Sequence, residues 1–360
     1  MSETPEPGLL GNQKSLYEHA LQLHRLHPDV ALPQDGKPYP DSGSHDRRSP
    51  WSDDQRRRGV RAAAVLDEFF ARPDAMPDEL VWAFHDVDVP IHHNEHITAA
   101  ALRADRERVQ QTGRWLVRHS TDQCSTVIGL ALLAADWDDG DIDLIRHIGL
   151  LSETFGPLAA CALKRRRDGS EALLWLAQRT AGWGRVYIIE ALCQLGGHSA
   201  RPWLLRNALD GDSLNGYYVG DVALVADVHE AITTENPDDE LIDHTGLLLR
   251  IMAGNSGMGM TWNGYHPVRR VLDAHVTHLA RQHPTRDRYL TAAFIADHLL
   301  KEDSSSPNLS PDHRTVLLNR YLTVLHREDW SSMAHAALDP TDKFTAWFLE
   351  TIAPRLRLPS

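Results

Sequence analysis

The sequence has few cysteines and no long apolar run. Only Cys124, Cys161 and Cys193 occur among its 360 residues, and an odd number of widely spaced cysteines does not indicate a disulfide framework. No stretch reaches the length of about 18 consecutive apolar residues that a transmembrane helix requires. Residues 1–7 are acidic and proline-rich, whereas a secretory signal would be basic and then apolar. These absences predict reduced cysteines, a cytoplasmic location and no membrane partner.

Lysine is also scarce, so arginine supplies most of the positive charge. Five of the 37 basic residues are lysine, and the arginines cluster within residues 56–58, 103–118 and 164–167. The formal net charge of −13 disfavours a nucleic-acid backbone as the main ligand, because a phosphate-binding surface must be basic. The arginine clusters nevertheless leave a local basic face, and therefore a nucleic-acid partner, open.

Strand-like alternation of polar and apolar residues is essentially absent. From about residue 55 to residue 352, apolar positions recur at helical spacing and are separated by short turns, which predicts a single all-α repeat domain. Residues 1–54 are expected to be an irregular N-terminal segment with one short helix at 16–26, and residues 353–360 a tail. Because prolines interrupt residues 28–54, we expect this part to be extended or mobile, or to lie across the helices.

Several helix boundaries can be predicted within this pattern. We expect one long helix over residues 94–118, and a helix opened by Gly156 and Pro157 because proline suits a first helical turn. A long loop covers residues 255–267. The helices expected beyond it span residues 268–281, 288–301, 311–325 and 342–352.

Two successive segments read as copies of one helical hairpin. The sequence from Phe155 to Leu158 is matched 28 residues later by the sequence from Trp183 to Val186, and Ser170 matches Ser199 at an offset of 29. A pattern that persists through two helices is typical of stacked helical repeats. The segment 141–235 resembles HEAT-repeat and related α-solenoid proteins. The resemblance rests on Asp141-Ile142-Asp143-Leu144-Ile145, Gly156-Pro157-Leu158-Ala159-Ala160 with Ala162-Leu163, and the Trp183 copy with Ala191-Leu192.

The resemblance implies a right-handed superhelical stack of antiparallel helix pairs. Most families of this type are protein-binding scaffolds, which implies a non-enzymatic protein that holds a protein or peptide partner in a concave groove. One bacterial branch comprises DNA glycosylases that hold alkylated DNA in a basic, tryptophan-lined groove. A DNA-binding or glycosylase-like enzyme, in which Asp210 or Asp221 assists base cleavage, is therefore an alternative.

Polar and aromatic residues predict where such a groove would lie. Trp175 and Trp203 occupy nearly equivalent repeat positions, so we interpret them as core between repeats. Side chains that binding surfaces commonly use are concentrated around them and in the loop 255–267, which could fold over the groove. The candidate groove residues are Arg185, Tyr187, Arg206, Asp210, Asp212, Asn215, Tyr217, Tyr218, Asp221, His229, Glu230, Trp262 and Tyr265.

A histidine-rich stretch offers a third hypothesis. His92 and His96 are four residues apart, so on one helix they would share a face and could bind zinc or another divalent metal, with His85 or Asp86 as further ligands. Such a site would support a metal-dependent enzyme. The alternatives are a capped turn, in which Asn94 begins the helix and leaves His92 outside it, and a contact for a polar ligand. The sequence predicts no other cofactor and assigns no catalytic residue.

Overall fold

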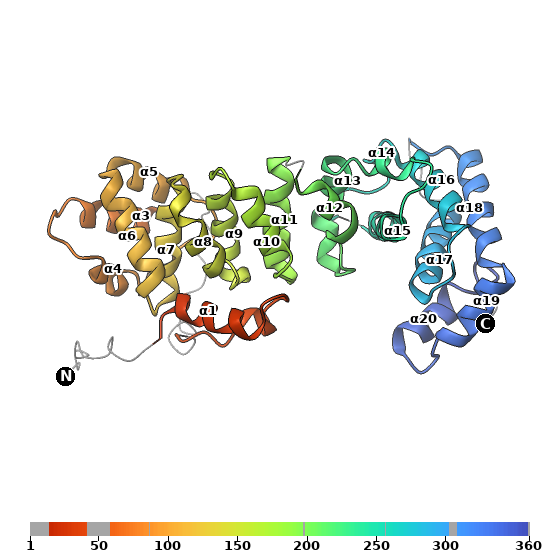
Figure 1. The fold of residues 1–360 in the computed structure, drawn as a ribbon, viewed down its shortest axis with the longest axis horizontal. Helices are drawn as coiled ribbons and strands as arrows, with labels where there is room; N and C mark the ends of the chain where they lie inside the picture. The colour runs from red at the N-terminus through yellow and green to blue at the C-terminus, as the bar shows by residue number, and fades with distance from the viewer. Residues whose placement is uncertain are drawn as a thin grey trace. The chain divides into compact units, whose positions relative to one another are not determined.

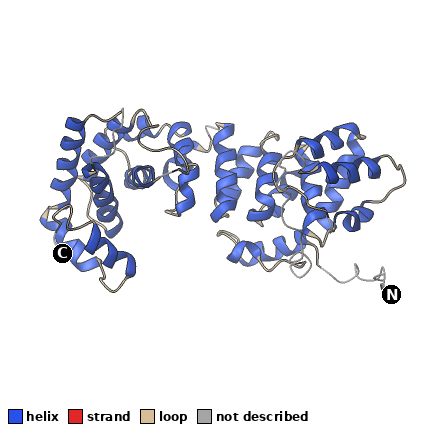
Figure 2. Cartoon of the chain, turned by 180° about the vertical axis from the view of Figure 1, so that it is seen from behind, coloured by secondary structure: helices blue, strands red, loops and turns tan. Residues whose placement is uncertain are grey.

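The computed structural model describes residues 14–41, 58–85, 87–196, 199–255, 257–301 and 308–358. Across these ranges the regular structure consists of nineteen α-helices and three short 3₁₀ helices, without a strand (Figure 2). The all-α prediction is confirmed. None of the described helices has the length and apolar character needed to cross a membrane. Backbone contacts divide the chain into two compact units, Met1–Ala200 (unit 1) and Arg201–Ser360 (unit 2). The expected single domain over residues 55–352 stays a prediction.

Figure 1 labels the helices of both units. Unit 1 contains α1 (Leu16–Leu26), η2 (Pro33–Gly36), α3 (Val60–Phe70), α4 (Pro77–Phe84), α5 (Glu95–Arg103), α6 (Arg106–His119), α7 (Gln123–Ala134), η4 (Asp139–Asp141), α8 (Ile142–Ile148), α9 (Ser152–Leu163), α10 (Gly169–Ala177) and α11 (Gly182–Leu195). Unit 2 contains α12 (Arg201–Asn207), η5 (Ser213–Tyr217), α13 (Val219–Val225), α14 (Val228–Ile232), α15 (Asp239–Gly254), α16 (Val268–Leu279), α17 (Arg286–Leu300), α18 (Pro311–Leu325), α19 (Glu328–Ala337) and α20 (Lys343–Thr351).

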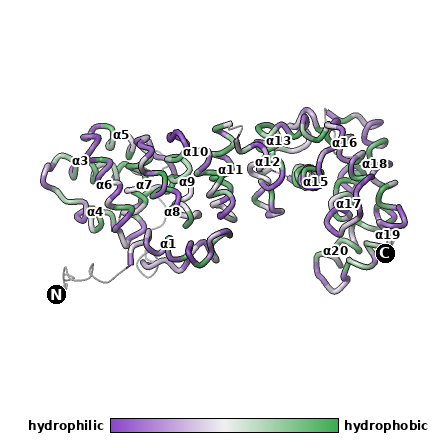
Figure 3. The backbone as a smooth tube through the Cα atoms, in the orientation of Figure 1, coloured by the Kyte–Doolittle hydropathy of each residue, from purple (hydrophilic) through white to green (hydrophobic). Residues whose placement is uncertain are grey.

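The core of unit 1 is a row of three neighbouring helices. Helix α9 packs between α7 and α11, while α6, α8 and α10 pack beside them, each against the helix that follows it in the chain. Every residue of α7 from Cys124 to Ala134 is buried, and most of α9 is buried too. Figure 3 colours the chain by hydropathy, with apolar residues in green. A helix that is apolar on all sides is stable only when other helices cover it. The apolar composition of α7 therefore fixes its central place.

Positions that match between the sequence copies touch each other in unit 1. Gly156 on α9 faces Gly184 on α11, and a Cβ atom on Gly156 would lie 3.8 Å from the Gly184 backbone. The hydroxyl oxygens of Ser170 and Ser199 lie 3.3 Å apart. Neighbouring copies are thus in contact through equivalent residues, as expected for helical repeats that pack against one another.

The described part of the N-terminal segment, residues 14–41, lies against this row of helices. Helix α1 forms where the sequence predicts it and packs on α6 and α8 (Figure 1). The Asp35 carboxylate accepts hydrogen bonds from the backbone N–H groups of Ser152 at 2.7 Å and Glu153 at 3.0 Å. The Asp41 carboxylate accepts one from the Gln123 N–H at 2.7 Å. These two aspartates satisfy the first N–H groups of α9 and α7, so residues 28–41 lie across the starts of both helices.

Two predicted boundaries are wrong. The expected helix 94–118 is two helices, because the Asp105 side chain accepts the Arg108 N–H at 2.9 Å and starts α6 anew. Helix α9 begins at Ser152 and not at Gly156, because Asp35 caps it from a distant part of the chain, and Pro157 lies inside the helix. Helix α19 was not expected from the sequence.

Helix α15 is the centre of unit 2. It contacts α12, α13, α14, α16 and α17. Leu241, Leu248, Leu249 and Met252 are buried on its core side. Its other side carries polar residues at helical spacing, and this amphipathic pattern places the charged groups of α15 at a surface hollow.

Candidate functional site

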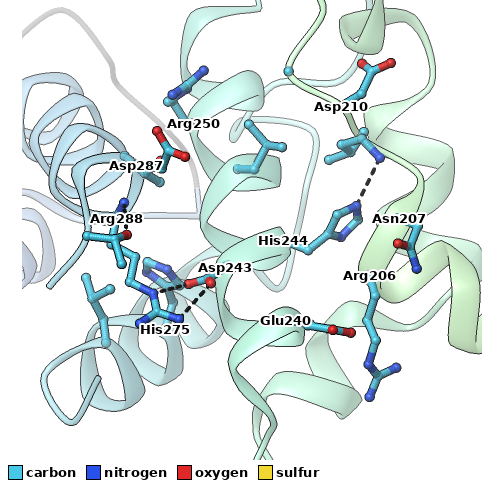
Figure 4. A pocket seen from close by; sticks show the side chains of 16 residues that line it. Arg206, Asn207, Asp210, Glu240, Asp243, His244, Arg250, His275, Asp287 and Arg288 are labelled. Carbon is cyan, nitrogen blue, oxygen red and sulfur yellow. Dashed lines mark hydrogen bonds and ion pairs between the residues drawn. The ribbon is translucent and has the colours of Figure 1, made fainter. Parts of the chain in front are cut away.

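The candidate site is a pocket of about 600 Å³ in unit 2, which α12, α15 and α17 form together (Figure 4). Helix α15 supplies one side with residues spaced three or four apart, so they share a face. The α15 residues that line the pocket are Glu240, Asp243, His244, Leu247 and Arg250. Residues 206–211 at the end of α12 line one wall, and Asp287, Arg288 and Thr291 of α17 line the other.

A histidine joins two of these helices. The buried His244 ring accepts a hydrogen bond at Nε2 from the Leu209 backbone N–H, with the two nitrogens 3.0 Å apart. A ring nitrogen that accepts carries no proton, so the neutral imidazole carries its proton on Nδ1. This bond ties the chain after α12 to α15. The His244 imidazole thus holds the wall formed by the end of α12 in place.

Ion pairs neutralise two of the three arginines that line the pocket. Arg288 on α17 is 2.7 Å from Asp243 and 3.0 Å from Asp239, and its pKa is raised chiefly by the hydrogen bond to Asp243. Arg206 on α12 lies 2.6 Å from Asp238 and holds the pKa of that carboxyl below its ordinary value. Both arginines connect a pocket wall to the start of α15.

A second histidine, His275, lines the pocket from α16. The fully buried His275 ring of α16 has Nδ1 2.8 Å from the Tyr321 hydroxyl. Burial, with a smaller contribution from His278, lowers the His275 pKa from 6.5 to about 3, so this ring is neutral at neutral pH. Gly246 on α15 allows this close packing, because a Cβ atom there would lie 2.6 Å from His275 Nε2.

Arg250 differs from the other two arginines. None of the described residues forms a hydrogen bond or an ion pair with its guanidinium, which is half-buried and lies 5.5 Å from the centre of the Phe294 ring. Burial lowers the Arg250 pKa, and the charge of Asp287 opposes that effect. An unpaired guanidinium that has lost part of its water gains from an anionic ligand. Arg250 is therefore the most distinctive charge in the pocket.

The structure brings only two of the predicted groove residues, Arg206 and Asp210, into this pocket. Four others are buried and stabilise the fold: Asn215, Tyr218, Trp262 and Tyr265. The Asn215 side chain accepts the Asp210 N–H at 2.9 Å, the Tyr218 hydroxyl donates to the Ala208 carbonyl at 3.2 Å, and the Trp262 indole donates to the Leu249 carbonyl at 2.9 Å. Because these four side chains face the interior, they are not part of the candidate binding surface.

The remaining predicted groove residues lie elsewhere. Five of them are in unit 2 outside the pocket: Asp212, Tyr217, Asp221, His229 and Glu230. Arg185 in unit 1 is buried and donates to the Ala177 carbonyl at 2.7 Å, so it completes the end of α10. Tyr187 stacks on Trp183, with ring centres 6.1 Å apart.

The histidine-rich stretch folds as a capped turn. The Asn94 side chain accepts the N–H groups of His96 and Ile97, so α5 begins at Glu95 and His92 lies outside it. His92 instead packs against the Tyr187 ring, and His85 Nδ1 is 3.3 Å from the Asp122 carboxylate. Asp86 lies outside the described residues. Within the part of the chain that the structure describes, no three His, Cys, Asp or Glu side chains are grouped so that they could hold a metal ion.

Several arginines of the predicted basic clusters are used inside unit 1. Arg103 pairs with Asp67 at 2.6 Å, Arg106 with Asp136 at 2.8 Å and Arg114 with Asp141 at 2.7 Å. Arg166 is buried and donates to the carbonyls of Leu133 and Ala162. These four guanidinium groups stabilise helix packing, and Arg56 and Arg57 lie outside the described residues.

The pocket residues of α15 were not predicted from the sequence. A high density of aromatic and charged residues marked other segments, whereas α15 offers a single polar face. The spacing of Glu240, Asp243, Leu247 and Arg250 was the available signal, since residues three or four apart share one helix face. Comparison with family models, curated proteins and solved structures finds no match for this chain.

Proposed function

We propose that this chain is a non-enzymatic α-solenoid protein of the HEAT-like type and that the α15 pocket holds a protein or peptide partner. The observation that carries the proposal is the α15 face itself. A long central helix of unit 2 directs Glu240, Leu247 and Arg250 into a hollow of about 600 Å³, which is the size of a typical ligand site. A helix-lined groove with charged ends and an apolar middle suits an extended peptide.

Contacts within unit 1 support the solenoid part of the proposal. Gly156 and Gly184 are equivalent in the two sequence copies and face each other, as Ser170 and Ser199 do. Proteins built from such repeats bind partners through surfaces that successive helices share. Cys124, Cys161 and Cys193 form no disulfide, which agrees with the cytoplasmic location that we propose.

The state of the histidines supports binding over catalysis. His244 accepts a backbone N–H, and His275 is buried and shares a hydrogen bond with Tyr321. These contacts give each imidazole a structural role. The internal pairing of Arg103, Arg106 and Arg114 gives the nucleic-acid alternative less support than the peptide proposal.

The test is a selection of displayed random peptides on the full-length protein, followed by affinity measurements. The variant Leu247→Trp would fill the middle of the pocket. We expect it to weaken the selected peptides at least tenfold, because the larger side chain occupies the volume that the peptide needs. Leu224→Trp is the matched control, since Leu224 is 55% exposed on α13 and lies outside the pocket.

Two results would contradict this function. The first is a selection that enriches no peptide over an unrelated protein surface. The second is equal affinity of the enriched peptides for wild type and for Leu247→Trp, with unchanged circular dichroism. Either would show that the α15 pocket is not the binding surface.

A further inference from the structure

An exposed group of aromatic rings continues the pocket beyond Arg250. The Phe294 ring of α17 stacks on Phe344 and Trp347 of α20, each at 6.0 Å between ring centres. Phe344 is 43% exposed and Trp347 is 44% exposed. We call Phe294, Phe344 and Trp347 the aromatic ledge. Large apolar side chains that stay exposed together mark interaction sites.

Arg250 connects the pocket to the aromatic ledge. Arg250 lines the pocket and also lies over the Phe294 ring, 5.5 Å from its centre. Thr291 lines the pocket three residues before Phe294 on α17, so both side chains share a helix face. A ligand group that reaches Arg250 therefore lies next to the ledge.

The charges along α15 give the surface two ends. Glu240 lines the pocket, and no described residue pairs with its carboxylate. It precedes Arg250 by ten residues, or about 15 Å along the helix. That distance corresponds to about four steps of an extended peptide. Arg206 and Arg288 lie beside the same face but are neutralised by Asp238 and by Asp239 and Asp243.

We propose that the ligand is an extended peptide segment with an acidic residue next to an aromatic residue and a basic residue about four positions before the acid. Its carboxylate pairs with Arg250, its aromatic side chain packs on Trp347, and its basic group faces Glu240. This inference rests on the proposed function and names the class of partner. Asp287 also faces Arg250 and is part of the environment that the carboxylate enters. A carboxylate in bidentate contact with the guanidinium competes with that longer-range attraction.

The probe is a fluorescein-labelled peptide, Lys-Ala-Gly-Ser-Asp-Trp, with two relatives that carry Asn in place of Asp or Ala in place of Trp. Affinity is measured by fluorescence anisotropy on the full-length protein. We expect Arg250→Gln to weaken the Asp peptide by about tenfold and to leave the Asn peptide unchanged, since charge-assisted hydrogen bonds are lost only in the first case. Arg250→Lys keeps the charge and should retain part of the affinity.

Separate variants test the aromatic ledge and the contact between Glu240 and the basic residue of the peptide. Trp347→Ala should weaken the Trp peptide several-fold and leave the Ala peptide unchanged, because only the first has a ring to pack. Glu240→Gln should weaken all three peptides, which share the lysine. The controls are Arg269→Gln on α16, an exposed arginine outside the pocket, and Trp82→Ala on α4, where the side chain is 53% exposed.

The outcomes separate this inference from the proposed function. Absence of binding by the probe, or equal loss for the Asp and Asn peptides in Arg250→Gln, overturns the inference. If selected peptides still depend on Leu247 in that case, the pocket binds peptides of another class. If they do not depend on Leu247, both proposals fail. Circular dichroism of each variant confirms that a loss of affinity is not a loss of fold.

Discussion

Acid should destabilise unit 2 through His275. The ring, which belongs to α16, is fully buried against Tyr321, and burial lowers its pKa from 6.5 to about 3. The unfolded chain therefore binds a proton below pH 6.5, whereas the folded chain does not until about pH 3. Folding stability from this group is fully present above the unfolded pKa and is lost as the pH falls below it.

The magnitude follows from the two pKa values. As the pH falls from about 7 to about 5, proton binding to the unfolded chain raises the unfolding equilibrium constant by about 1.4 logarithmic units. This corresponds to a loss of about 2 kcal/mol of unfolding free energy. The loss continues toward pH 3 and ends where the folded ring itself becomes protonated. This loss is a substantial fraction of the unfolding free energy of a typical domain, which is about 5–15 kcal/mol.

The assay is guanidinium unfolding followed by far-ultraviolet circular dichroism at the two pH values. His275→Gln removes the titrating group and keeps a polar partner for Tyr321. We expect this variant to be less stable than wild type at about pH 7 but to lose about 2 kcal/mol less on acidification. His298, whose pKa burial lowers to about 4, titrates in both proteins and cancels in the difference. His335→Gln is the control, since His335 is exposed on α19.

Equal pH dependence of wild type and His275→Gln would refute the reasoning. It would mean that the ring is already accessible to protons in the folded state. An equal loss of pH dependence in His335→Gln would also contradict the reasoning, because the effect would then not depend on burial of the His275 ring.

The helix row of unit 1 gives two further predictions. Gly184→Ala should destabilise the protein by about 1–3 kcal/mol in denaturant unfolding, because the new Cβ atom would lie 1.8 Å from Ser152 Oγ. Gly254→Ala, where no atom lies within 4 Å, is its control and should be neutral or slightly stabilising, and equal effects would contradict close packing of α9 on α11. Asp35→Ala should cost about 1–2 kcal/mol and speed amide exchange at Ser152 and Glu153, which lose their capping carboxylate. Unchanged exchange at those two amides would show that the cap is not formed in solution.

The local part of the fold was readable from the sequence. Helix α1 was predicted because its apolar residues have helical spacing, and that spacing depends only on residues close in the chain. The repeat match also identified real neighbours, because Ser170 and Ser199 meet across adjacent copies. In each case the sequence sufficed because the determining interaction is short-range or periodic.

The candidate site was decided by tertiary structure. The high density of aromatic and charged residues in the sequence pointed to Tyr218 and Trp262, but both side chains are buried. Their burial depends on packing between distant segments. The same density did not point to Arg250. This arginine stands out because no described residue forms a hydrogen bond or ion pair with its guanidinium, which lies over a ring of α17. The sequence thus determined an all-α chain, whereas only the structure revealed which charged groups are paired and which are not. The physical reason is that charge pairing and burial are set by three-dimensional proximity, which no local pattern encodes.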